Sequence, residues 1–374
     1  MLFQYPAKLD NIFKKLIKLK AKPIIVGGFV RDKLLGIDSL DIDIEVYNVA
    51  SFEKLENILK EFGSTNNVGK SFGVCKLDFD GFKLDFTLPR SDSKISVGHS
   101  GFDIKIDASL DFKTASSRRD FTINTIGYDI SSKCLLDPYN GINDLKNKVL
   151  KVVDTDKFAQ DPLRVLRAMQ FCARFELYAD ASLIHICKDM CHKNILAELP
   201  QERIFEEFNK LLLKANKPSI GFKFLEQIDA FTFFDELQLD KKDFDFTLKR
   251  LDRCEKDIVL LLSILCYKMS YKQKESFILK LTNQKSILRD IDNYHHIINF
   301  LKHKDMVLKY NIVKNTNLAN LKKLLTALKF ETTQDIKSLQ PIIHGKDLIE
   351  VGFTPSKEFS SLLQLIYEVQ LLDF

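Results

Sequence analysis

Glycine divides this chain of 374 residues into two unequal parts. Eleven of the fourteen glycines lie at or before Gly141, and the rest of the chain holds only Gly221, Gly345 and Gly352. Because glycine marks tight turns and places where backbones approach closely, the first part should be an α/β domain. The remainder is rich in Leu, Lys and Phe and has few helix breakers, so it should be a string of helices.

Apolar alternation and flanking turn residues predict the elements of both parts. Strands are expected at Pro23–Val26, Ile42–Tyr47, Val74–Phe79 and Phe82–Leu88, with two more around Ile123–Asp129 and Cys134–Asp137. Helices are expected at Leu9–Leu19, Val30–Leu35, Phe52–Glu61 and over most of the chain after Pro162. The domains should abut directly, because no Pro/Ser-rich linker or fixed-period repeat separates them.

Composition and charge limit the class of protein. Hydrophobic residues make up 45% and charged residues 29% of the chain, which excludes collagen-like, wholly disordered and disulfide-framework proteins. A formal net charge of +5 is too small to establish a nucleic-acid partner by itself. Seven scattered cysteines without a CxxC pair predict reduced thiols, and the N-terminal residues lack the apolar core of a signal peptide. The longest apolar run, Ile258–Tyr267, is too short to cross a bilayer and predicts a buried helix, so a cytoplasmic protein is expected.

The segment from Ile24 to Asp32 predicts a buried strand, a glycine turn and the start of a helix. Gly27 and Gly28 lack the Cβ atoms that would keep an anion away from free backbone N–H groups. Arg31, on the first helical turn, could hold phosphate oxygens with its planar guanidinium. Taken alone, the glycine pair also fits a tight strand-to-helix turn beside a surface arginine.

Three acidic residues follow in predicted strands. Asp41 and Asp43 should point to one face of a strand, where two carboxylates repel one another unless they bind a cation such as Mg²⁺. Taken alone, the pair also fits solvated surface charge. Asp85 lies in an apolar strand and should face a metal or a partner, as a third metal ligand or as the base for an attacking hydroxyl; the alternative is an acid on an edge strand. Together these residues describe two-metal phosphoryl transfer.

Five motifs in this order resemble the class II tRNA nucleotidyltransferase/poly(A) polymerase family. They are Gly27-Gly28-x-Val30-Arg31-Asp32, Asp41-x-Asp43, Arg118-Arg119-Asp120-Phe121-Thr122-Ile123-Asn124, Asp137-Pro138-Tyr139-Asn140-Gly141 and Asp161-Pro162-Leu163-Arg164-Val165-Leu166-Arg167. The stretch Arg90-Ser91-Asp92-Ser93-Lys94 is similar to bacterial CCA-adding enzymes rather than to the poly(A) polymerase branch. The resemblance implies an α+β fold, with a polymerase-β-like nucleotidyltransferase head (1–137), a helical neck (138–215) and a helical body and tail (216–374).

The resemblance also implies an activity and its residues. The expected reaction is template-independent addition of C, C and A to tRNA 3′ ends from CTP and ATP, with Mg²⁺ as cofactor and pyrophosphate as leaving group. The expected partner is the tRNA acceptor arm, and neither a membrane nor an obligate protein partner is implied. Asp41 and Asp43 would bind the metal and, with Asp85, form the catalytic set. The residues expected to bind the nucleotide are Gly27, Gly28, Arg31, Arg90, Arg118, Arg119, Asp120, Asn124, Asp161, Arg164 and Arg167.

Asp161 and Arg164 match the pair that reads the incoming base in this family, and their spacing supports that role. Residues three apart share a helix face, so one acceptor and one rigid donor fork can face a Watson–Crick edge. Cytosine and adenine both place an amine donor beside a ring-nitrogen acceptor, whereas uracil and guanine present the reverse. An intrahelical ion pair is the structural alternative. Gln160 stands where the family usually has Glu, which predicts an active enzyme with altered C-to-A switching.

Lysines gather near the C-terminal end of the chain. Seven of them face a single acid, Asp305, between Leu301 and Lys329. A solvated helix is one interpretation, and contact with tRNA phosphates is the one we favour. The candidate residues are Lys302, Lys304, Lys322 and Lys323.

Two further groups of residues have a metal-like composition without the spacing of a metal site. Cys187 and Cys191 lie four apart on a predicted helix and should pack in the core rather than bind zinc. The His295-His296 pair should lie on a solvated face.

Other functions remain open at the level of the sequence. An enzyme that adds only CC or only A, or a poly(A) polymerase, would carry the same motifs. An inactive RNA-binding adaptor could use the same scaffold, but the Asp41 and Asp43 pair argues against it because a binding protein does not need adjacent carboxylates.

Overall fold

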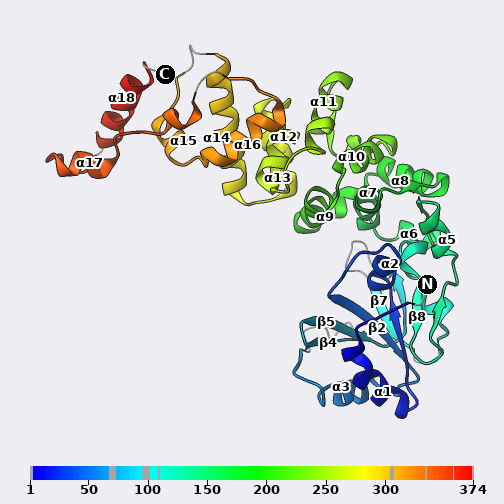
Figure 1. Cartoon of the computed structure of the whole chain (residues 1–374). Helices are drawn as coiled ribbons and strands as arrows, with labels where there is room; N and C mark the ends of the chain where they lie inside the picture. Colours follow the sequence, from blue (N-terminus) through cyan, green and yellow to red (C-terminus); the bar gives the residue numbers. More distant parts are fainter. Residues whose placement is uncertain are drawn as a thin grey trace. The chain divides into compact units, whose positions relative to one another are not determined.

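The computed structural model describes residues 3–66, 73–94, 102–107, 110–303, 307–332, 335–356 and 358–372 (Figure 1). The chain divides into two compact units. The first comprises Met1–Leu199 with Gln227–Asp229, and the second comprises Pro200–Glu226 with Ala230–Phe374. The predicted boundary at residue 137 lies inside the first unit, so the division into head, neck, body and tail stays a prediction.

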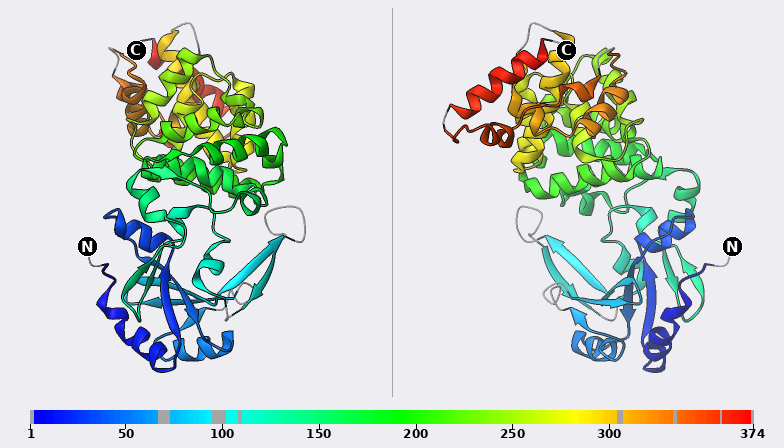
Figure 2. Two further views of the ribbon diagram at one scale, coloured as in Figure 1. Left: turned by 90° about the vertical axis from the view of Figure 1, so that its right-hand side faces the viewer. Right: turned by 60° about the vertical axis from the view of Figure 1, so that its left-hand side comes forward.

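A seven-stranded mixed sheet forms the centre of the first unit, in the order β3-β4-β5-β2-β1-β8-β9 (Figure 2). Strands β2 and β5 run parallel, and the other neighbouring strands run antiparallel. The strands are β1 (Lys22–Val26), β2 (Asp41–Tyr47), β3 (Thr65–Asn66), β4 (Val74–Phe79), β5 (Phe82–Thr87), β8 (Gly127–Asp129) and β9 (Cys134–Leu136).

The six predicted strands correspond to β1, β2, β4, β5, β8 and β9. The segment Ile123–Asp129 differs from its prediction, because Thr122–Asn124 form a 3-10 turn and the strand begins only at Gly127. The sequence does not predict the separate hairpin of β6 (Arg90–Lys94) and β7 (Phe102–Ile106), since β6 is polar throughout and lacks apolar alternation.

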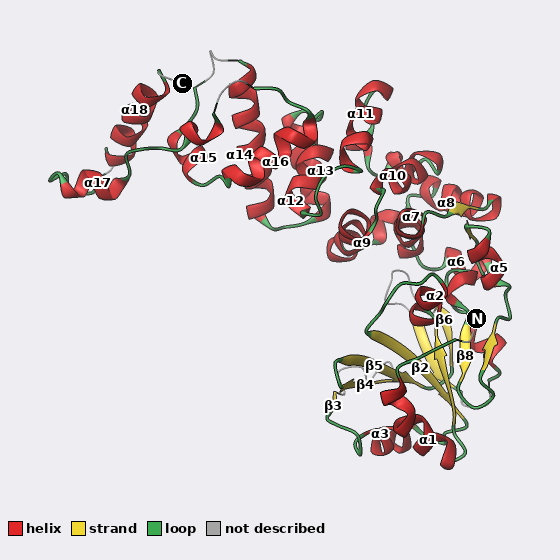
Figure 3. Cartoon of the chain, in the orientation of Figure 1, coloured by secondary structure: helices red, strands yellow, loops and turns green. Residues whose placement is uncertain are grey.

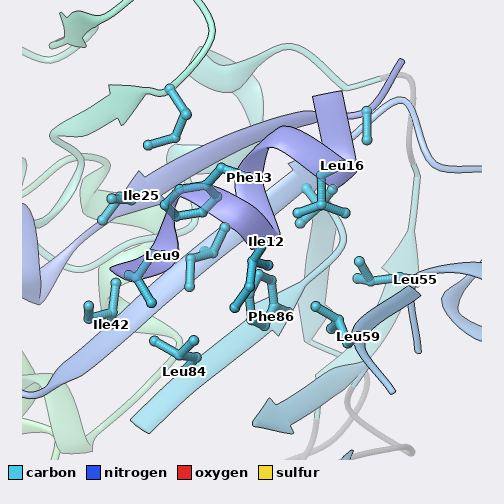
Figure 4. Close-up of a cluster of buried hydrophobic side chains, with 14 of the residues drawn as sticks. Leu9, Ile12, Phe13, Leu16, Ile25, Ile42, Leu55, Leu59, Leu84 and Phe86 are labelled. Carbon is cyan, nitrogen blue, oxygen red and sulfur yellow. The ribbon is translucent and has the colours of Figure 1, made fainter. Parts of the chain in front are cut away.

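Two helices cover one face of the sheet and form its hydrophobic core (Figure 4). They are α1 (Asp10–Lys18) and α3 (Phe52–Leu59). Ile12 of α1 and Leu55 of α3 are fully buried, together with Ile25, Ile42 and Phe86 of the sheet. Burying each such side chain stabilises the fold by roughly 1.5–3 kcal/mol. The alternation that gives this face its apolar residues leaves the opposite face of β2 to acidic side chains.

The acidic face of the sheet is only partly covered by apolar packing. Helix α4 (Phe112–Ser116) lies on this side, where Ala115 packs with Ile24, Val26 and Tyr47. The remaining helices of the first unit are α2 (Gly28–Leu34), α5 (Gly141–Lys146), α6 (Thr155–Ala159), α7 (Leu163–Phe175) and α8 (Ala181–His192). A short parallel pair, β10 (Val149–Leu150) with β11 (Tyr178–Ala179), joins the segments around α7.

The second unit consists of helices in the part of the chain that the structure describes (Figure 3). They are α9 (Gln201–Lys214), α10 (Pro218–Gln227, whose last residue belongs to the first unit), α11 (Lys241–Leu251), α12 (Ile258–Leu265), α13 (Tyr271–Leu281), α14 (Lys285–Lys302), α15 (Tyr310–Lys314), α16 (Leu318–Leu328), α17 (Gly345–Glu350) and α18 (Phe359–Leu371). Helix α12 is buried from Leu260 to Leu265, as predicted for a core helix. Among the described residues, no helix is both long and apolar enough to span a membrane.

The two groups with a metal-like composition have different outcomes. Cys187 and Cys191 are buried free thiols on α8, as predicted, and burial raises the pKa of Cys191 to about 12. The prediction of a solvated face is wrong for His295. Its Nε2 lies 2.8 Å from the carbonyl oxygen of Ser263, its ring packs edge-on against Tyr267, and burial lowers its pKa to about 4.

Candidate active site

Three acidic residues of β2 lie on one face of the sheet. Asp41 and Asp43 are exposed to solvent, whereas Glu45, two positions further along the same face, is buried. The shared face of Asp41 and Asp43 agrees with the alternation of the sequence. The strand therefore presents two accessible carboxylates next to a third that is enclosed by protein.

Asp85 of β5 is in direct register with Asp43 of β2, because these two strands pair in parallel. On its other side Asp85 is in register with Lys76 of β4, whose Nζ lies 2.8 Å from Asp85 Oδ2. The expectation that Asp85 faces a partner agrees with this ion pair, and β5 lies between β4 and β2 rather than at the edge of the sheet. The partner that the sequence leaves unnamed is Lys76.

The environment of Asp43 favours a bound cation. Asp43 is exposed, but the surrounding protein still removes part of its water shell and so raises the pKa of its carboxyl group. The charge of Arg119 lowers this pKa, and the nearby carboxylates of Asp85, Glu45 and Asp41 raise it further. Within the described residues, no group of three or more His, Cys, Asp or Glu side chains could hold a metal alone. Two carboxylates completed by substrate oxygens and water suit Mg²⁺, so the donor set fits this ion.

The glycine turn lies beside these carboxylates. Strand β1 ends at Val26, which is in register with Asp43, and α2 begins at Gly28. Gly27 has a φ of +68° and donates its backbone N–H to the carbonyl oxygen of Ile126 at 3.1 Å. A side chain at Gly27 would be strained by this φ and would collide with Arg119, so glycine is required here.

Arg118 and Arg119 converge on the buried Glu45. Their Nη2 atoms donate to Glu45 Oε1 at 2.8 Å and 2.9 Å, and Tyr47 Oη donates to Glu45 Oε2 at 2.9 Å. Burial alone would raise the pKa of Glu45, but the charges of Arg119 and Arg118 and the bond from Tyr47 hold it below its usual value. The site therefore contains an ionised carboxylate that holds two guanidinium groups together.

Arg31 lies in a network of internal contacts. Its guanidinium is buried, with Nε and Nη2 donating to Asp32 Oδ1 at 2.8 Å and 2.6 Å, and Nη1 donating to Asn124 Oδ1 at 2.6 Å. The same group lies over the rings of Phe171 and Phe175, and burial lowers its pKa. In this structure the Arg31 guanidinium is held by internal partners, so contact with phosphate oxygens stays a prediction.

Asp120 and Asn124 continue the buried network that starts at Arg31. Asn124 Nδ2 donates a hydrogen bond to Asp120 Oδ1 at 2.8 Å. Arg167 donates from Nε to Asp120 Oδ2 at 2.7 Å, and its Nη2 lies 2.6 Å from the same oxygen. Burial would raise the pKa of Asp120, but the charge of Arg167 and the bond from Asn124 hold it below its usual value. The network joins the 3-10 turn of the head to helix α7.

Asp161 and Arg164 are neighbours at the start of α7, but Asp161 precedes the helix, which begins at Leu163, and does not share a helix face with Arg164 as predicted. Arg164 Nε lies 3.8 Å from Asp161 Oδ2, and both side chains are 13% exposed. Arg164 also donates to the carbonyl oxygens of Lys157 and Arg118, while Asp161 Oδ1 accepts from the backbone N–H of Leu163. These bonds fix the direction of both side chains relative to the helix.

The remaining predicted residues are Arg90 and the lysines of the second unit, each of which has its own local environment where the structure describes it. Arg90 opens β6 and is half-buried. Lys323 pairs with Glu255 at 2.7 Å, and Lys302 lies over the ring of Tyr267 at 4.7 Å. Lys322 lines a hollow between α16 and the segment that follows it. Lys304 lies outside the described residues, so the lysines of this segment are divided among several local environments.

Sequence reasoning gave no role to Glu45 or Lys76. Glu45 continues the alternation of Asp41 and Asp43, so its face could be inferred, but its two arginine partners lie more than seventy positions away. Lys76 alternates with buried residues on β4, a pattern that does not identify the residue opposite it.

Comparisons with known proteins agree with this arrangement. The family described as "Poly A polymerase head domain" matches residues 24–151, and the family described as "Probable RNA and SrmB- binding site of polymerase A" matches residues 184–239. The chain is 30% identical over 292 residues to the CCA-adding enzyme of Buchnera aphidicola subsp. Baizongia pistaciae, covering 72% of this chain and 67% of that protein.

Other relatives match over a shorter region. The multifunctional CCA protein of Vibrio parahaemolyticus is 37% identical over 209 residues, and the alignment covers 55% of this chain and 49% of the relative. The chain thus spans about half the length of several curated relatives that it matches.

Solved structures share the fold over nearly the whole chain. A structure of a Thermotoga maritima CCA-adding enzyme complexed with tRNA has a TM-score of 0.70 at 21% identity, covering 99% of this chain and 96% of that one. An apo CCA-adding enzyme has a TM-score of 0.73 at 21% identity, covering 98% and 92%. Both confirm the α+β fold.

Proposed function

We propose that this chain, which belongs to the tRNA nucleotidyltransferase/poly(A) polymerase family, adds C, C and A to the 3′ end of tRNA from CTP and ATP. The observation that carries the proposal is the pair of exposed carboxylates, Asp41 and Asp43, on a strand that lies directly beside the glycine turn. Relatives named as CCA-adding enzymes, and related structures described as complexes with ATP, CTP and tRNA, support the same function. The proposed location is the cytoplasm.

The proposed reaction joins two substrates and releases pyrophosphate. The terminal 3′ oxygen of tRNA forms a bond to the α-phosphorus, the bond from that phosphorus to the pyrophosphate oxygen breaks, and the hydroxyl loses its proton. Asp41 and Asp43 would hold Mg²⁺, which when bound lowers the pKa of the hydroxyl and offsets the charge of the phosphates. Asp85, held by Lys76 beside Asp43, provides either the proton acceptor or a third oxygen ligand.

Base selection is proposed for Asp161 and Arg164. An acceptor just before α7 and a donor fork on its first turn lie 3.8 Å apart and complement the amine donor and ring-nitrogen acceptor that cytosine and adenine share. The backbone carbonyls of Lys157 and Arg118 hold the Arg164 fork, so the pair is oriented before a nucleotide arrives. Selection then needs no nucleic-acid template.

The test uses tRNA transcripts that end without CCA, with C or with CC, each incubated with one of the four labelled nucleoside triphosphates. The proposal expects C, C and A to be added in order, with synthesis stopping at CCA. Incorporation that stops at CC, or that occurs only on the CC end, would identify a specialised enzyme. A run of adenylates would identify a poly(A) polymerase.

An inactive adaptor is the remaining alternative. It would bind tRNA without incorporating any nucleotide at any Mg²⁺ concentration. The control is the Asp43→Asn variant. Asp43 is proposed to act in catalysis and not in tRNA binding, so this variant should bind tRNA like the unaltered protein.

A further inference from the structure

Glu45 occupies an unusual position for an acidic residue. It lies within β2, in register with Ile24 of β1 and Thr87 of β5, and only 1% of its surface is exposed. A buried carboxylate is strongly destabilising unless it is paired and hydrogen-bonded. The partners of Glu45 therefore indicate why an acid is present inside the sheet.

Those partners are two arginines and one tyrosine. One oxygen, Oε1, accepts from both Arg118 Nη2 and Arg119 Nη2, and the other, Oε2, accepts from Tyr47 Oη. Two guanidinium groups that meet at one oxygen atom would repel each other without the carboxylate. Glu45 thus allows two consecutive arginines to gather at one place.

The position of Arg119 shows which part of the site lies next to these two arginines. Its Nη1 lies against the glycine turn, 2.6 Å from where a Cβ of Gly27 would lie. Val26, which precedes this glycine, is in register with Asp43. The two guanidinium groups are therefore fixed next to the glycine turn and the accessible carboxylates, and 18% of the Arg118 side chain and 16% of the Arg119 side chain are exposed.

We propose that Glu45 is a positioning residue, which holds Arg118 and Arg119 as a preformed pair for the triphosphate of the incoming nucleotide. This inference rests on the proposed function, because it assigns a ligand group to the same site. Glu45 itself does not touch the substrate. It acts through the two arginines, whose planar donors suit phosphate oxygens.

The test separates triphosphate binding from nucleoside binding. Calorimetry with Mg²⁺ measures the Kd of inorganic triphosphate, CTP and CMP for the unaltered protein and for Glu45→Asp, Glu45→Gln and Tyr47→Phe. The shorter Asp cannot reach both arginines, so triphosphate and CTP should bind about tenfold more weakly, while the Kd of CMP stays unchanged.

The two other variants separate charge from geometry. Gln keeps the side-chain length and one oxygen acceptor but loses the charge, so triphosphate and CTP should bind roughly threefold more weakly. Tyr47→Phe removes the bond to Oε2 and leaves both arginines on Oε1, so it should bind all three ligands like the unaltered protein. Thermal unfolding of each variant shows whether it is folded at the temperature of the titration.

Two results would overturn the inference: unchanged triphosphate binding in Glu45→Asp, or equal losses for triphosphate and CMP. If Glu45→Asp does not fold, Glu45→Gln decides by the same comparison. If the unaltered protein binds neither triphosphate nor CTP, the proposed function falls as well. If it binds both and incorporates CTP while the Glu45 variants bind normally, the positioning role alone is wrong.

Discussion

Gly27 and Arg119 lie in direct contact although more than ninety positions separate them in the sequence: a Cβ added to Gly27 would lie 2.6 Å from Arg119 Nη1. The guanidinium occupies the space that the missing side chain leaves. The absence of a side chain at Gly27 therefore leaves room for the Arg119 guanidinium as well as for any ligand that approaches the backbone.

The first prediction concerns this contact. Gly27→Ala should destabilise the protein by about 1–3 kcal/mol, because φ is +68° and the new methyl group displaces Arg119. Urea unfolding measures the effect. The matched control is Gly28→Ala, where a Cβ would meet Arg31 Nη2 at 3.7 Å, an ordinary contact, so its stability should stay close to that of the unaltered protein. Equal stability of both variants would contradict this structure of the turn.

The second prediction concerns pH and the helical unit. The folded protein binds a proton at His295 only near pH 4, whereas an unfolded chain does so near pH 6.5. Between these values the unfolded state holds more protons, so this residue makes stability fall as pH falls from about 6.5 to 4. Urea unfolding at several pH values should show a shallower slope in this window for His295→Gln. An identical slope would mean that the folded protein does not lower the pKa of His295.

The third prediction tests base selection. Arg164→Lys keeps the charge but loses the fork, so the preference of kcat/KM for CTP and ATP over UTP and GTP should fall at least tenfold. The assay uses tRNA ending in CC for ATP and GTP, and tRNA without CCA for CTP and UTP. Arg174→Lys, on the same helix, should keep the selectivity. If Arg164→Lys slows all four nucleotides equally, the base is read elsewhere.

The fourth prediction concerns tRNA binding by the second unit. Lys322→Ala should reduce the slope of log K against log salt by about 0.7–0.9, the value for one lost phosphate contact. Glu255→Gln should steepen it, because Lys323 is released from its 2.7 Å ion pair. Lys60→Ala, at the C-cap of α3 in the first unit, is the control and should leave the slope unchanged. If the Lys322 and Glu255 variants also leave it unchanged, these lysines are surface charge only.

The sequence predicts the helices and strands whose apolar pattern lies within a single continuous segment. Alternation from Asp41 to Tyr47 identifies both the strand and the face of its carboxylates, and the apolar run at Leu260–Leu265 identifies a core helix. The β6–β7 hairpin is not predicted because β6 consists of polar residues and gives no apolar alternation, although β7 does alternate.

The site is less predictable because its contacts join distant segments. Motif matching places Arg31 near the nucleotide, yet Asn124, 93 positions away, turns its guanidinium inward. The same limitation hides Glu45, whose partners Arg118 and Arg119 arrive from another motif. Spacing identifies which residues gather in one region, but the direction of each arginine depends on which buried acceptor reaches it.

The most direct test of nucleotidyl transfer at β2 is the rate of CTP incorporation into tRNA by Asp43→Asn, measured in a single turnover with Mg²⁺. We predict that the rate falls by at least a hundredfold. Because the folded state raises the pKa of Asp43, its ionisation opposes folding at neutral pH, so the variant should also melt at a higher temperature. Retention of more than about a tenth of the unaltered rate would contradict the assignment of catalysis to this pair of carboxylates.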